Sequence, residues 1–379
     1  MNETVALLGT CETKAEEMSA LSEALARQGL AILPFDLSLA SGGAVLPGEE
    51  KLRRMATKVG DVSATITRAA PAAVLAIGGG TGSEMALQVL KSLPPGLPKF
   101  LITTLPFDPR AALADTDVTL IPTLCDIQGM NAPLRRIFSR SAAMVAGAVR
   151  ATPEPGGRAK SVAVSLLGVT QQAGAGILRR LREAGLETAA FHANGFGGAA
   201  LVRYAAEGAF SGVIDMTVNE IVRMHVAGAH VPMPDRFTCA ADLPRVILPG
   251  TLNFLDGGIL EQMPAEWRAR PHYRQSGYFT HVKLTEAEIT RATRALAADL
   301  NRSTAPCEVL LPMGGFSSED RPGGAIEDAG LRACAAEIFE AEARAYSVTR
   351  LPHHLNDPET AAEAVSRLLP HLQTKGSPT

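Results

Sequence analysis

Short apolar runs alternate with amphipathic helical stretches along this chain, and this alternation constrains the fold more than any other feature. In the first half, five runs are predicted strands: residues 4–8, 31–35, 73–77, 100–104 and 118–122. Between the first two, Met18, Leu21 and Leu25 fall on one face of a predicted helix at 16–28. Strands that alternate with helices form a parallel sheet covered on both faces.

The alternation restarts after a segment at 151–160 that is rich in proline, glycine and charge, as interdomain linkers are. The second set of predicted strands comprises residues 161–167, 187–191, 212–215, 245–249 and 307–311. A chain of 379 residues is long enough to form two cores. We therefore predict an α/β protein with two Rossmann-like domains, at 1–155 and 156–379, each a mainly parallel sheet flanked by helices.

Charge and cysteine usage narrow the class of protein. The net charge of -3 and the 36 basic residues spread among 39 acidic ones argue against nucleic acid as a partner. No apolar run approaches the roughly 20 residues that span a bilayer, so no membrane segment is predicted. The five cysteines include no C-x-x-C pair, which fits neither a disulfide framework nor a zinc site. We predict a cytoplasmic protein.

A glycine-rich turn follows the third predicted strand and opens a helix. It consists of Gly78, Gly79, Gly80, Thr81 and Gly82. Glycines before a helix leave room for a ligand and aim amide N–H groups at an anion. The turn therefore predicts a phosphate-bearing ligand, and the alternative is a tight strand-to-helix turn without a ligand.

Ser83 stands where the dinucleotide-binding fingerprint has its third glycine, and the chain has no P-loop lysine pattern. An NAD-dependent oxidoreductase is therefore disfavoured. The chain also lacks the G-x-S-x-G pattern of serine hydrolases.

Polar residues follow the other strands of the first domain, where ligands of open α/β sheets bind. Gly9, Thr10, Thr13 and Lys14 come after the first strand and are candidates for holding phosphate oxygens. The alternative is that Thr13 caps the helix and Lys14 is solvated. Asp36 closes the second strand, where Rossmann-like folds place an acid on a ribose hydroxyl, or it simply begins a loop.

Two further candidates, Gly129 and Asn131, follow the last strand of this domain. They precede a helix that carries Arg135 and Arg136, and arginine offers bidentate phosphate contacts. The alternative is that this arginine pair is solvated or lies at a subunit contact.

The second domain places acid–base groups after its strands. His192, Asp215 and Glu220 are the candidate catalytic residues, because a histidine and two carboxylates at one sheet edge are suited to proton transfer. The alternatives are a hydrogen-bonded histidine at the sheet edge and a solvent-facing Glu220. No metal site is predicted, because the spacing of His192, Glu220 and His225 matches no familiar ligand set.

Six motifs taken together resemble the Tm-1-like ATP-binding family, also called UPF0261. They lie at 8–17, 77–82, 129–131, 191–198, 234–236 and 311–320. The resemblance covers essentially the whole chain in the same order. It implies two Rossmann-like domains, a homodimer, and ATP held by the N-terminal domain.

The resemblance also implies a function in some relatives. The plant member is a virus-resistance factor, and in many members the module is joined to or encoded with a TIM-barrel protein, which would here be a separate chain. This chain departs from the family pattern at Asn194, near Arg223 and at Asn253, all in the second domain. Nucleotide binding is therefore the property that transfers best.

Two hypotheses follow. The first is a cytoplasmic ATP-binding protein, with or without magnesium, whose phosphates lie on the glycine-rich turns of the N-terminal domain. The second is a metabolic enzyme, a hydrolase or lyase, that acts on a small anionic metabolite in the cleft between the domains, with His192 and Glu220 as acid and base.

Overall fold

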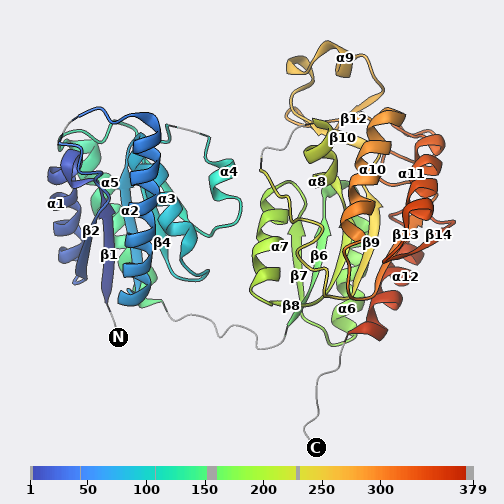
Figure 1. Cartoon of the computed structure of the whole chain (residues 1–379), viewed down its shortest axis with the longest axis horizontal. Coiled ribbons are helices and arrows are strands. Elements are labelled where there is room, and N and C mark those ends of the chain that lie inside the picture. The colour runs from blue at the N-terminus through green and yellow to red at the C-terminus, as the bar shows by residue number, and fades with distance from the viewer. Residues whose placement is uncertain (1–2, 43, 107, 152–159, 228–230, 373–379) are drawn as a thin grey trace, which may run out of the picture. The chain divides into compact units, whose positions relative to one another are not determined.

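The computed structural model describes residues 3–42, 44–106, 108–151, 160–227 and 231–372 (Figure 1). The chain divides into two compact units, Met1–Pro155 and Gly156–Thr379. Both are α/β units with a parallel sheet flanked by helices, which confirms the predicted fold class. Residues 152–159 of the predicted linker lie outside the described residues.

The N-terminal unit has a five-stranded parallel sheet in the order β2-β1-β3-β4-β5. Its strands are β1 (Thr4–Gly9), β2 (Ala31–Asp36), β3 (Ala73–Gly78), β4 (Lys99–Thr103) and β5 (Thr119–Pro122). Its helices are α1 (Cys11–Arg27), α2 (Gly48–Ala69), α3 (Gly80–Ser92), α4 (Arg110–Leu113) and α5 (Ala132–Arg150). All five predicted strands are present.

Both faces of this sheet are buried, because successive side chains of the central strands point to opposite faces and pack against helices there. Leu7 and Leu75 pack with α1 and α5 on one face, whereas Ala6 and Val74 pack with α2 and α3 on the other. β3 is buried along its whole length, as expected for a central strand. β2 lies at the edge, where Pro34 costs no ladder hydrogen bond.

The C-terminal unit has a six-stranded parallel sheet in the order β14-β13-β9-β8-β6-β7. Its strands are β6 (Ser161–Leu166), β7 (Thr188–His192), β8 (Phe210–Thr217), β9 (Arg245–Gly250), β13 (Cys307–Pro312) and β14 (Ser347–Leu351). Its longer helices are α6 (Gln171–Glu183), α7 (Phe196–Ala206), α10 (Glu286–Leu300), α11 (Ala329–Glu342) and α12 (Pro358–Leu368). α6 and α12 cover one face, and α7, α10 and α11 cover the other.

A small antiparallel sheet, which the sequence patterns did not predict, completes this unit. We call it the cap sheet; its order is β10-β12-β11. Its strands are β10 (Phe254–Gly257), β11 (His272–Arg274) and β12 (Thr280–Lys283). Figure 1 shows it with α9 (Ala265–Arg268) at the end of the unit where β8 leads into α8 (Asn219–Val222).

The strand order places the carboxyl ends of particular strands beside each other. In the N-terminal unit the chain passes from β1 to β2 in one direction across the sheet and from β3 to β4 in the other direction. In the C-terminal unit it likewise passes from β6 to β7 in one direction and from β8 to β9 in the other. Such topological switch points are where ligands of open α/β sheets bind. We therefore expect ligand sites at the turns that follow these four strands.

Candidate functional site

The switch point of the N-terminal unit brings together residues that follow β1 and β3. A Cβ atom on Gly82 would lie 3.7 Å from Cγ2 of Thr10, in ordinary contact. The hydroxyl oxygens of Thr10 and Thr13 are 2.8 Å apart. Gly9 ends β1 and packs against Met18, leaving no room for a side chain. Thr10, Thr13 and Gly82 thus share one location.

Gly78 has a structural reason to be glycine. A Cβ atom there would lie 2.5 Å from the backbone nitrogen of Ser83, at the start of α3. The buried Ser83 hydroxyl donates to the Gly78 carbonyl at 2.8 Å and lies 2.7 Å from the Thr103 hydroxyl. Serine in place of the third fingerprint glycine therefore fastens α3 to the ends of β3 and β4.

Gly79 and Gly80 have no such packing reason. Apart from the chain next to them and the backbone of their own helix, no heavy atom of the described residues lies within 4 Å of where their Cβ atoms would be. Gly79 is the N-cap residue of α3, and the first turn of this helix contains no acidic residue. In the part of the chain that the structure describes, no side chain caps it. An uncapped helix N-terminus has unsatisfied amides and favours an anion.

Lys51 adds a positive charge to this helix end, and the sequence motifs did not reveal it. Its Nζ donates to the Thr81 hydroxyl at 3.1 Å. In the described ranges it has no carboxylate partner. Lys51 belongs to the first turns of α2, and no motif around it signals a contact with a residue 30 positions away. An unpaired cation therefore stands beside the open N-terminus of α3.

Replacing Gly80 with alanine is expected to raise the free energy of unfolding of the N-terminal unit by about 0.5 kcal/mol. The new methyl group meets open space, the backbone does not require positive φ, and alanine restricts the unfolded chain. Urea unfolding followed by far-UV circular dichroism measures the change. A loss of stability would show that the turn is tighter than its geometry indicates.

Asp36 holds the start of α1. Its Oδ1 accepts from the amides of Cys11 and Ser38, each at 2.9 Å. Burial raises the pKa of Asp36, but hydrogen bonds from Ser38 and Cys11 outweigh it and leave the pKa below its usual value. The Ser38 hydroxyl also accepts from the Glu12 amide at 2.9 Å. α1 is therefore capped by the loop after β2, unlike α3.

The loop after β5 meets the first turns of α1. Lys14 donates from Nζ to the Ile127 carbonyl, and the Gly129 amide donates to Glu17 Oε1 at 2.7 Å. Asn131 is the N-cap of α5, where its Oδ1 accepts from the Leu134 amide at 2.9 Å. Lys14, Gly129 and Asn131 thus hold this loop against the helix at the same edge of the sheet.

In the C-terminal unit, Glu220 occupies the glycine-rich turn after β7. Its buried Oε1 accepts from the amides of Gly195 at 2.8 Å and Gly198 at 3.1 Å, and a Cβ atom on Gly198 would overlap this carboxylate. Its Oε2 accepts from Nε of Arg236 at 2.6 Å. The protein itself thus supplies the anion at the start of α7.

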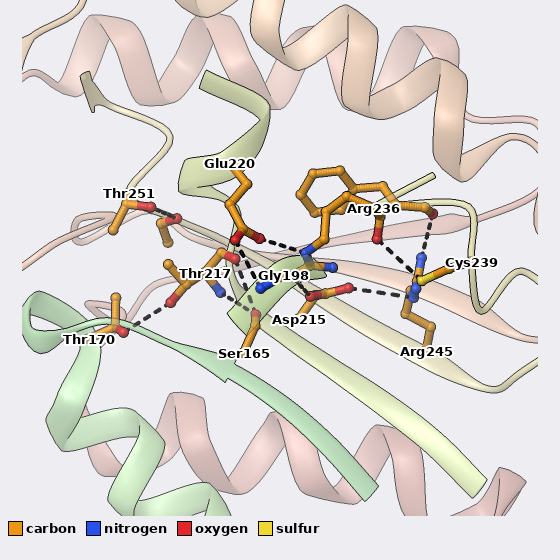
Figure 2. A network of polar contacts seen from close by, with 12 residues as sticks. Ser165, Thr170, Gly198, Asp215, Thr217, Glu220, Arg236, Cys239, Arg245 and Thr251 are labelled. Carbon is orange, nitrogen blue, oxygen red and sulfur yellow. Dashed lines mark hydrogen bonds and ion pairs between the residues drawn. The ribbon is translucent and has the colours of Figure 1, made fainter. Parts of the chain in front are cut away.

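Asp215 shares the same arginine, and Figure 2 shows Arg236 between the two carboxylates. Nη2 of Arg236 lies 2.6 Å from Oδ1 of Asp215, and Nε of Arg245 lies 3.6 Å from Oδ2. Burial raises the pKa of Asp215, but the guanidinium groups of Arg236 and Arg245 outweigh it and hold the pKa below its usual range. The two carboxylates and the two arginines together form a buried ionic network.

His192 is not hydrogen-bonded to this network in the described residues. It ends the edge strand β7, its side chain is exposed, and Gly197 packs directly on its backbone. Among the described residues, neither Glu220 nor Asp215 has a hydrogen bond with His192. In the described residues no hydrogen bond therefore joins His192 to the other two predicted acid–base residues, which share Arg236.

In the described part of the chain, no helix combines the length and apolar character needed to cross a membrane. Within the same residues, no group of three or more histidine, cysteine, aspartate and glutamate side chains is placed to hold a metal ion.

Comparison with known proteins places these units in a family. The models of the Uncharacterised protein family (UPF0261) match at residues 44–154 for the N-terminal domain and 159–372 for the C-terminal domain. A UPF0261 protein of Mesorhizobium japonicum is 31% identical over 96% of this chain and 98% of its own length. A UPF0261 protein of Clostridium tetani is 26% identical over 97% of this chain and 99% of its own length.

A tomato protein and one solved structure extend the comparison. The ToMV resistance protein Tm-1(GCR237) of Solanum lycopersicum is 28% identical over 79% of this chain and 41% of its own length. The UDP-GlcNAc 2-epimerase of Methanocaldococcus jannaschii aligns over 98% of this chain and 94% of its own at 9% identity, with a TM-score of 0.20, too low to bear on function. With both domain models matched, the chain belongs to the UPF0261 family, to which the Tm-1 resistance protein is related.

Proposed function

We propose that the N-terminal unit binds ATP in the cytoplasm, with the phosphates at the start of α3. The observation that carries the proposal is the uncapped N-terminus of α3, with open space at Gly79 and Gly80 and with Lys51 beside it. The amides and the ammonium group together attract an anion, and a polyphosphate has the charge and the acceptor oxygens to use both.

A comparison of two glycine-rich turns, the one after β3 and the one after β7, supports this assignment. The turn after β7 also aims amides at an anion, but there Glu220 is the anion and Arg236 neutralises it. The turn after β3 has the same kind of opening, and in the described residues no carboxylate occupies it. The difference favours an external anion at α3.

Neighbouring residues have proposed roles in the same site. The hydroxyl groups of Thr10, Thr13 and Thr81 are polar contacts for phosphate oxygens, and Lys14 adds a cation from α1. Asp36 uses Oδ1 to cap α1, which leaves Oδ2 for a ribose hydroxyl. The choice of ATP among nucleotides comes from the resemblance of the glycine-turn motifs to the Tm-1-like family.

Replacing Lys51 with alanine is expected to weaken ATP binding at least about tenfold, because the variant loses a charge-assisted contact to phosphate. Calorimetric titration with ATP, with and without magnesium, measures the affinity. The matched control is Arg68→Ala, which removes the same charge from the last turn of α2. The control is expected to bind like the wild type.

ATP binding by the wild-type protein is the direct test of the proposal. Absence of ATP binding by the wild type would refute it, and equal affinities of the Lys51 and Arg68 variants would remove Lys51 from the site. Gly80→Ala gives a second test, because the methyl group enters the space assigned to the phosphates. This variant is expected to be more stable than the wild type and yet to bind ATP more weakly.

A further inference from the structure

One face of the cap sheet carries polar and aromatic side chains. Asp256 and His281 are cross-strand partners on β10 and β12, and the His281 ring stacks on Phe254 with centroids 4.2 Å apart. The alternate residues Leu255 and Val282 enter the main core of the unit. The face with Phe254, Asp256 and His281 is therefore turned away from that core.

This face lies against the carboxyl edge of the main sheet. Phe254 packs with Leu167 and Val169, which follow β6, and with Ala193, which follows β7. The Asn219 side chain, just after β8, donates from Nδ2 to the Ala193 carbonyl at 3.4 Å. The cap sheet thus meets the edge where β6 and β8 form the second topological switch point.

Buried polar atoms without a partner gather here. Among the described residues they include Asn219 Oδ1, Arg223 Nε, Asn253 Oδ1, Asp256 Oδ1 and His281 Nδ1. Asn219 and Asn253 are at most 1% exposed, His281 is 6% exposed and Arg223 is 8% exposed. Leaving a buried polar group unpaired costs about 1–3 kcal/mol, so five in neighbouring segments call for an explanation.

The other polar atoms of these side chains are held by the protein. Nη2 of Arg223 lies 2.8 Å from Oδ2 of Asp256, and Nδ2 of Asn253 donates to the Ser317 hydroxyl at 3.3 Å. Asn219, Arg223, Asn253 and Asp256 are therefore each held through one polar atom while another has no partner among the described residues, and His281 is held by its stack on Phe254. Ligand sites contain a few polar groups in fixed positions, and side chains that keep an unpartnered polar atom can serve as such groups.

The backbone is strained at the same edge. Thr251, between β9 and Asn253, has a φ of 68° although it is β-branched and fully buried. This is a costly conformation for threonine, and such strain clusters at ligand sites.

We propose that these residues form a second binding site, in the C-terminal unit, for an uncharged polyhydroxylated molecule. The free oxygens of Asn219, Asn253 and Asp256 accept from ligand hydroxyl groups, and Nε of Arg223 donates to a ligand oxygen. Arg223 and Asp256 cancel each other's charge, and burial lowers the pKa of His281, which keeps the imidazole neutral near pH 7. The proposal does not depend on ATP binding.

Saturation-transfer NMR on the full chain tests the site with D-glucose, D-ribose and myo-inositol, and with D-gluconate as the anionic comparison. The wild type is expected to give signals with at least one neutral probe. Asn253→Leu and His281→Phe are expected to weaken that binding at least about tenfold, because each removes a polar atom that the ligand uses. The control Asn194→Ala, an exposed residue after β7, is expected to bind normally.

Two variants keep the test independent of folding. His281→Phe preserves the stack on Phe254, and Asn253→Leu removes an unpaired buried oxygen, so neither is expected to unfold the unit. Three results would overturn the proposal: no signal with any neutral probe, a signal with gluconate alone, or binding that both variants retain.

Discussion

Arg236→Met is expected to lower the free energy of unfolding of the C-terminal unit by about 3–5 kcal/mol. Arg236 is fully buried, and its two ion pairs to Asp215 and Glu220 are each 2.6 Å long. The variant fills the volume but leaves two buried carboxylates without their shared cation. Trp267, the single tryptophan, packs against the core of this unit, so its fluorescence in urea reports the transition.

A triple variant separates charge from packing. Adding Asp215→Asn and Glu220→Gln to Arg236→Met removes both carboxylate charges that Arg236 neutralised while keeping the side-chain shapes. The triple variant is expected to regain a large part of the lost stability. If Arg236→Met alone costs less than about 1 kcal/mol, the network is not the electrostatic core of the unit.

Gly78→Ala is expected to lower the free energy of unfolding of the N-terminal unit by about 3 kcal/mol, at the upper end of overpacking effects. The new methyl group would lie 2.5 Å from the backbone nitrogen of Ser83 and 2.6 Å from the Gly82 carbonyl carbon. Backbone atoms cannot turn aside, so the start of α3 must move. Far-UV circular dichroism in urea measures the loss.

Gly80→Ala is the matched control, because it adds the same methyl group two residues later, where no other segment of the described residues lies within 4 Å. Fluorescence of Trp267, which lies in the other unit, is expected to show an unchanged transition in both variants. Similar stabilities of the two variants would mean that the contact at Gly78 relaxes without cost.

The periodicity of apolar residues was sufficient for the parallel sheets. The runs predicted as strands match β1 to β9 and β13, and the central strands among them are buried on both faces, which gives a nearly continuous apolar signal. The cap strands were not predicted, since they have only three or four residues and form through contacts with the main sheet. The edge strand β14 was missed as well, because only Val348 and Leu351 of its five residues are apolar.

The roles of individual side chains depended on contacts between distant segments. Lys51 meets Thr81 across 30 residues, and local patterns around either residue do not predict this contact. Glu220 was a candidate base because it follows a strand, but its carboxylate is bound by the amides of Gly195 and Gly198 and by Arg236. Its catalytic role stays a prediction, and its geometry is that of an internal counter-ion.

By itself, the sequence determined two α/β units and the positions of their glycine-rich turns, because hydrophobic periodicity and glycine act locally. Only the tertiary structure decided which turn is closed and which is open. Both turns present amides at a helix start, but Glu220 and Arg236 reach one of them, and Lys51 stands beside the other. That choice is set by long-range packing, which places a charge beside the turn or leaves the space free.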